Sequence, residues 1–138
     1  MQHHIDGAVC NRTEKVAWLS QHAEECTDNL RVCWQGPELD RNCGFCEKCI
    51  RTKLNFWASG NAIPAAFPGT LTPETVASIK IDSLTKRREL ESLYFYAQDL
   101  HPKNHPILKI LKRKLTIAHF QNFISHGREL LSFALRGK

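Results

Sequence analysis

Four cysteines lie within 17 residues of the chain, at a spacing that suits a single metal ion. They follow the pattern C-x9-C-x2-C-x2-C and are Cys33, Cys43, Cys46 and Cys49. Tetrahedral Zn²⁺ takes four ligands, at about 2.3 Å when they are thiolate sulfurs. A C-x2-C step wraps two sulfurs around one ion where the backbone turns tightly, and Gly44 permits this turn because glycine adopts positive φ at low cost. The spacing therefore predicts a four-cysteine zinc site.

Such a site has no open position for substrate or water, which indicates a structural role rather than catalysis. Four thiolates around Zn²⁺ carry a formal charge of −2, and basic side chains close in sequence can offset it from around the ligands. We expect this of Arg31, Arg41, Lys48 and Arg51, although simple exposure to solvent fits the same four residues equally well.

Other uses of these thiols fit the sequence less well. Two disulfides suit an exported chain, but the first residues, "MQHHIDGAVC", contain no apolar core of a signal peptide. A thioredoxin-like redox pair would follow a strand in a βαβ pattern, which the sequence does not show. A catalytic zinc site would need one of the four cysteines to lie outside the ligand set. An iron–sulfur cluster also takes four cysteines and remains an alternative to zinc.

The remaining cysteines and the histidines give no second site. Cys10 and Cys26 lie outside the four-cysteine spacing, and we expect them to be small, semi-buried apolar side chains. The seven histidines show no ligand spacing with one another.

Helical periodicity dominates the elements that must position the cysteines, and no stretch shows convincing strand alternation. Helices are predicted over residues 13–25, 46–59, 72–79 and 83–99, from 106 onward, and over 119–135 with a break near Gly127. Gly60 lies where a left-handed C-terminal cap is needed. Residues 30–34 suggest a brief extended piece. The fold class that follows is mainly α: a small helical domain with a four-cysteine zinc-binding loop at the N-terminus of a helix.

Composition places the chain among ordinary globular proteins. It has 138 residues, of which 42% are hydrophobic and 24% charged. No apolar stretch approaches the roughly 18 residues of a membrane span, so we expect no membrane association and a cytoplasmic, reducing location. Residues 61–72 contain two prolines and a glycine and divide the chain. We expect a zinc-binding module over residues 1–60 and a basic helical region over 61–138, packed on it.

Charge is unevenly distributed along the chain. Residues 1–79 contain seven Lys/Arg against nine Asp/Glu, and residues 80–138 contain twelve against five. Such asymmetry can mark a surface for nucleic acid or another polyanion. The candidate contacts are Lys86, Arg87, Arg88, Lys109, Lys112, Arg113 and Lys114. Against this interpretation, the aromatic residues of the same half follow helical spacing and are expected in the core rather than as stacking platforms.

One stretch resembles a known family. "LRVCWQGPELDRNCGFCEKCIRTKLNFWASG" is similar to the cysteine-rich C-terminal part of PP-loop ATPases, nearest to the 7-cyano-7-deazaguanine synthase-like branch. The resemblance covers about residues 10–60 and includes "NRTEKVAWLS", similar to the helix that precedes this part in the family. It implies that the four cysteines hold a structural zinc ion. Trp34 matches the family's aromatic position, Gly44 the turn glycine, and Arg51 lies one residue from its basic position.

The family's catalytic machinery is missing from this sequence. PP-loop ATPases activate a substrate with ATP, using an S-G-G-x-D-S loop within a parallel α/β sheet. The chain contains no such motif and too few candidate strands to build that sheet. We therefore expect no catalytic activity from the chain alone. The predicted function is a structural zinc-binding module, a fragment or derivative of a PP-loop-type enzyme, that completes or docks on an ATP-binding partner domain. The alternative is a zinc-containing nucleic-acid-binding protein that uses the basic helices.

Overall fold

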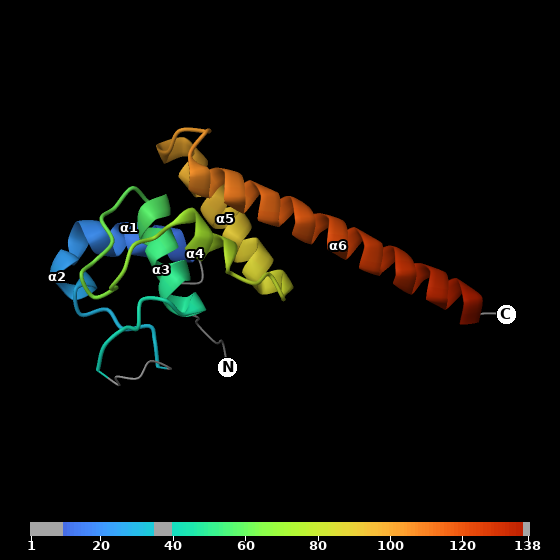
Figure 1. Cartoon of the computed structure of the whole chain (residues 1–138), viewed down its shortest axis with the longest axis horizontal. Helices are drawn as coiled ribbons and strands as arrows, with labels where there is room; N and C mark the ends of the chain where they lie inside the picture. The colour runs from blue at the N-terminus through green and yellow to red at the C-terminus, as the bar shows by residue number, and fades with distance from the viewer. Residues whose placement is uncertain (1–9, 35–39, 137–138) are drawn as a thin grey trace, which may run out of the picture.

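The structure is a computed structural model that describes residues 10–34 and 40–136. It is mainly helical, and the described residues contain no strand, which confirms the predicted fold class. Within these two ranges six helices follow one another (Figure 1): α1 (Arg12–His22), α2 (Glu24–Thr27), α3 (Glu47–Ala58), α4 (Pro73–Ala77), α5 (Leu84–Leu100) and α6 (Pro106–Arg136).

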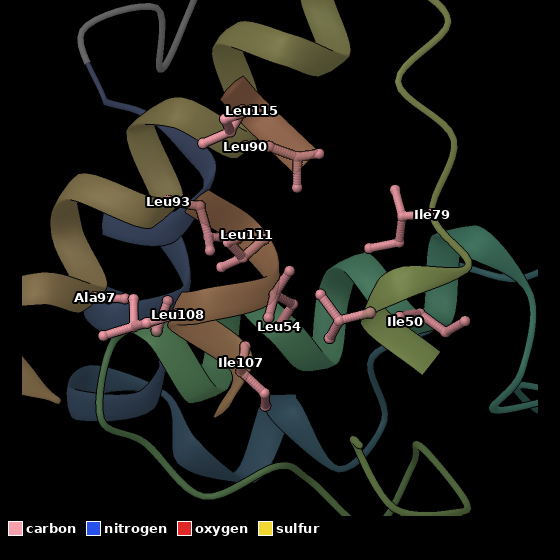
Figure 2. Packing of buried hydrophobic residues seen from close by; sticks show 12 residues of the cluster. Ile50, Leu54, Ile79, Leu90, Leu93, Ala97, Ile107, Leu108, Leu111 and Leu115 are labelled. Carbon is pink, nitrogen blue, oxygen red and sulfur yellow. The ribbon is translucent and has the colours of Figure 1, made fainter. Parts of the chain in front are cut away.

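Helix α3 lies between two hydrophobic clusters. Its Ile50, Leu54 and Ala58 join a larger cluster with α4, α5 and α6, and Figure 2 shows Leu54 beside Leu111 of α6. The larger cluster consists of Ile50, Leu54, Ala58, Val76, Ile79, Leu90, Leu93, Ala97, Ile107, Leu108, Leu111 and Leu115. The smaller cluster contains Val16, Cys33, Cys49, Phe56 and Phe67, so two of the predicted metal ligands are part of a core. The predicted division of the chain at residue 60 stays a prediction.

Polar side chains and the predicted glycine cap mark the ends of three helices. Thr72 caps α4 and Ser83 caps α5, each accepting a hydrogen bond from a backbone N–H three residues later. Gly60 adopts φ +73° and ends α3. Its N–H donates to the carbonyl of Trp57, and the next N–H, of Asn61, donates to Phe56. This pair of bonds is the Schellman arrangement that satisfies the last carbonyls of a helix.

Two predictions of local structure were wrong. The first helix is divided at Ala23 into α1 and α2, with Ala23 in a non-helical conformation. The two last predicted helices form one continuous helix, α6, because the sequence between Leu115 and His119 contains neither proline nor glycine. Gly127 does not interrupt it, since a single glycine costs a helix only about 1 kcal/mol.

Polar contacts fix α1 and α5 against α3. The buried Thr13 hydroxyl of α1 donates to the side-chain oxygen of Asn55, at 2.7 Å. Arg51 of α3 pairs with Glu47 one turn earlier and with Glu89 of α5, which also pairs with Arg12 of α1 at 3.3 Å. Because these groups lie partly out of water, the pairs hold their helices in register more firmly than exposed pairs would.

Candidate metal centre

The four predicted ligands converge on one point. All four Sγ atoms lie within 4.8 Å of one another. The Sγ of Cys33 is 3.5 Å from that of Cys43 and 3.6 Å from that of Cys46, and Cys43 is 3.9 Å from Cys49. A tetrahedron of sulfurs at about 2.3 Å from Zn²⁺ has edges of about 3.8 Å. The cluster therefore fits a single metal ion, and its separations exceed the roughly 2.05 Å of a disulfide.

Helix α3 positions two of the ligands. Cys46 is its N-cap residue and Cys49 lies in its first turn, fully buried. The N–H of Cys46 donates to the Sγ of Cys43 at 3.3 Å, which brings the third sulfur to the same end of the helix. The partial positive charge at a helix N-terminus favours thiolates there.

A buried asparagine holds the fourth ligand. The side-chain oxygen of Asn42 accepts the N–H groups of Val32 and Cys33, at 3.0 and 3.1 Å. Its amide donates to the carbonyls of Leu30 and Ala66, at 2.8 and 3.0 Å. The oxygen and the nitrogen of the Asn42 side chain each make two hydrogen bonds, and these bonds fix the segment of Cys33 beside Cys43. The sequence analysis missed this residue, and its place directly before the first C-x2-C step is only a weak signal.

Gly44 is required at the turn for two reasons. It adopts φ +81°, where other residues are strained. A Cβ atom at this position would also lie well inside 3.0 Å of the Pro68 carbonyl oxygen. The loop of the cysteines therefore packs directly against the backbone of the segment after α3, and only glycine permits the approach.

Lys53 joins the same two segments with a buried charge. Its side chain is 2% exposed, and its ammonium donates to the carbonyls of Gly44 at 2.9 Å, Gly69 at 2.8 Å and Pro68. Burial lowers the pKa of Lys53, while Cys49 and Cys43 raise it. A cation so placed offsets the charge of the thiolates. The sequence analysis missed Lys53, although a lysine within the inward stripe of Ile50, Leu54 and Trp57 was a usable signal.

Without a metal ion, the environment opposes thiolate formation. Burial raises the pKa of the Cys49 thiol to about 12 and also raises that of Cys46, with further contributions from the neighbouring thiols. Metal ligation requires thiolates, so binding at neutral pH must expel protons from these sulfurs.

The bases predicted around the ligands occupy different positions. Arg31 donates to the carbonyl of Cys33 at 3.1 Å, and Arg41 is exposed and 3.8 Å from Asp40. Lys48 places its ammonium over the ring of Trp34, 4.2 Å from the centroid. Arg51 is engaged with Glu47 and Glu89, as described above.

Other residues singled out in the sequence lie outside the cluster. Cys10 and Cys26 are both exposed, contrary to the semi-buried position expected for them. Of the aromatic residues near the ligands, Phe56 is fully buried, but Trp34 and Phe45 are 66% and 72% exposed.

The predicted polyanion contacts do not form one free basic surface. Lys86 pairs with Glu47 and Asp82, Arg87 pairs with Glu91, and Lys114 donates to the carbonyl of Ala77. The remaining four, all exposed, are Arg88 on α5 and Lys109, Lys112 and Arg113 on α6.

No family model, no curated protein and no solved structure matches the chain. Among the described residues, none of the helices combines the length and the apolar character that crossing a bilayer demands. The four-cysteine cluster is therefore the feature on which a function can be argued.

The first prediction concerns Gly44. Gly44→Ala adds both the strain of positive φ and the clash with Pro68, so we expect it to unfold the cysteine loop and to abolish metal binding. Gly60→Ala is the matched control, because Gly60 has φ +73° but its added Cβ would meet nothing closer than 3.6 Å. We expect this control to cost about 1–2 kcal/mol and to keep the metal. Metal content and urea unfolding measure both; similar losses in the two variants would contradict the packing argument.

The second prediction concerns Lys53. Lys53→Met keeps an apolar stem but leaves three carbonyls without their donor, so we expect the free energy of unfolding to fall by roughly 2 kcal/mol or more. Removal of the cation beside the sulfurs should also let a chelator extract the metal at lower concentration. Lys48→Met is the control: it loses a contact of about 1 kcal/mol or less with Trp34. The role of Lys53 is disproved if both variants behave alike in chelator titration and urea unfolding.

Proposed function

We propose that the chain is a zinc-binding helical module in which the ion is structural. The observation that carries this proposal is the convergence of four sulfurs within 4.8 Å at the start of α3. Four protein ligands complete a tetrahedral shell, and structural zinc sites are closed in this way. The ion's contribution would be to tie the segments of Cys33, Cys43 and α3 into one unit.

Zinc fits the donor set better than an iron–sulfur cluster. A cluster of several irons lies between its cysteines and holds their sulfurs farther apart than one ion does. Separations of 3.5–3.9 Å suit one ion. Thiolate ligation also favours a reducing compartment, and we propose a cytoplasmic location on this ground together with the sequence.

We further propose that the module derives from a PP-loop ATPase and docks on an ATP-binding partner domain. The support is the likeness of residues 10–60 to the cysteine-rich region of that family, together with the absence of the S-G-G-x-D-S motif from the sequence. Trp34 and Phe45 give the metal loop two exposed aromatic side chains. Large exposed aromatics that flank a rigid site are typical of protein interfaces.

Nucleic-acid binding ranks second. Three of its seven candidate bases already have partners in the fold, and the free bases on α6 run beside apolar side chains. We retain it as the alternative that the experiments below also test.

The third prediction tests the metal. Elemental analysis of the purified protein should find one zinc ion per chain. A strong chelator should abolish most of the cooperative unfolding, because in such modules the free energy of metal binding contributes to the free energy of folding. Cys46→Ser should lower both zinc content and stability, whereas Cys10→Ser, at an exposed position, should change neither. Equal damage from both substitutions, or iron in place of zinc, would refute the assignment.

The fourth prediction tests docking by the metal loop. The zinc-loaded chain should co-elute with a 7-cyano-7-deazaguanine synthase-type PP-loop domain from which the cysteine-rich region has been deleted. Replacing Trp34 and Phe45 together by serine should abolish co-elution without loss of zinc, because both side chains are exposed. Trp18→Ser on α1, 57% exposed, is the matched control and should bind normally. Absence of co-elution at micromolar concentrations would rule out this partner.

A further inference from the structure

Helix α6 presents an apolar surface that the fold does not use. Its first turns pack into the core through Leu108, Leu111 and Leu115, and its C-terminal half extends well beyond the other helices (Figure 1). Four large apolar side chains on the extending part are exposed: Ile117, Phe120, Phe123 and Ile124. Contiguous apolar residues of this kind mark interaction surfaces in monomeric proteins.

Phe120 points away from the body of the protein, whereas Ile117 lies at the edge of a hollow beside residues 77–81. A helix turns by about 100° per residue, so Phe120 lies about 180° from the buried Leu111. Ile117, Phe120 and Ile124 follow the 3-4 spacing of a helix–helix seam, and Phe123 widens it. The stripe is thus a helix-packing face without a helix against it among the described residues.

The apolar stripe continues into a basic one. Arg113 lies one heptad before Phe120 and therefore on the same side of α6, with Lys109 and Lys112 beside it. All three are exposed. Over its full length, α6 contains six Lys/Arg and a single Glu in its sequence.

A groove between α5 and α6 borders this face on the side of Phe120 and Phe123. It encloses about 360 Å³ and is lined by Tyr94 and Phe95 of α5 and by Lys112, Leu115 and Thr116 of α6. The one carboxylate in its lining, Glu91, is already paired with Arg87 and with His119. The groove therefore has an apolar floor, with the base Lys112 at its edge.

We propose that this surface, formed by Phe95, Lys112, Arg113, Phe120, Phe123 and Ile124, binds an acidic amphipathic helix of a partner protein. Its apolar side chains would pack along the stripe and its carboxylates would pair with the bases, as in helix-in-groove recognition. A second copy of the chain fits poorly, because it would bring one basic α6 against another. A flat bilayer does not enter a groove. Phe95, Phe120 and Phe123 are exposed, contrary to the core position expected for the aromatic residues of this half, and their rings offer stacking to nucleic acid. RNA binding is therefore an outcome of the test below.

This inference goes beyond the proposed function, because α6 extends away from the metal loop that carries Trp34 and Phe45 (Figure 1). Either surface can fail while the other binds. The zinc content of each variant, measured alongside, separates a failure of docking on α6 from a failure of the metal centre.

The fifth prediction is tested with a synthetic amphipathic helix of four heptads, with leucine at the packing positions and glutamate elsewhere. We expect it to bind the zinc-loaded chain at micromolar concentration, with an affinity that falls as salt is added, in fluorescence anisotropy. Replacing Phe120 and Ile124 together by serine should weaken binding more than roughly tenfold, as loss of central anchors does. The charge reversal of Lys112 and Arg113 to glutamate should weaken it comparably.

Matched controls are Trp18→Ser and Arg88→Glu, an exposed aromatic and an exposed base on other helices, and both should bind as the unchanged chain does. A peptide with lysine in place of glutamate should not bind. Equal binding of both peptides would overturn the inference. So would binding of duplex RNA or phosphatidylserine vesicles without binding of the acidic peptide, and so would self-association in sedimentation equilibrium that the Phe120 and Ile124 substitutions abolish.

Discussion

Four thiolate sulfurs can share one small, partly buried volume only when positive charge lies among them. In this protein they meet where the amide groups of a helix end, the ammonium of Lys53 and a metal ion would all act on the same point. Burial alone drives the thiols toward their protonated form, as the pKa of about 12 for Cys49 shows. The thiolate form that a metal ion needs therefore depends on a cation that offsets the cost of burying negative charge.

Lys53 connects this electrostatic requirement to the packing of the chain. Its ammonium binds the carbonyl of Gly44 on one side and those of Pro68 and Gly69 on the other. The segment after α3 is thus held to the metal loop through its backbone carbonyls, which accept hydrogen bonds from the side chains of Lys53 and, at Ala66, of Asn42. Gly44 lies in van der Waals proximity to the same segment. A buried lysine is costly unless its hydrogen bonds are satisfied, and three carbonyls meet that condition here. The metal centre and the residues 64–70 consequently form one structural unit.

The sequence predicted what depends on local spacing. The cysteine pattern and the left-handed cap at Gly60 both involve residues close together in the chain. Lys53 and Asn42 were missed because their partners, Pro68, Gly69 and Ala66, are loop carbonyls 15 to 24 residues away. No periodicity encodes a bond to a distant backbone carbonyl. The division of the C-terminal region into two helices was wrong because composition changes there, from basic to aromatic, without a residue that ends a helix.

That change of composition is itself informative about α6. The buried apolar residues up to Leu115 lie on the side that faces α5 and α3, whereas the exposed Ile117, Phe120 and Ile124 lie on another side of the helix. A helix that merely extended its core stripe would keep its apolar residues in one row and leave them exposed beyond the end of the body. Here the row shifts at the point where the body ends and joins the basic side chains of the outer face. Packing within this fold does not explain why these exposed side chains are apolar. We therefore attribute the apolar outer face of α6 to a contact with another molecule.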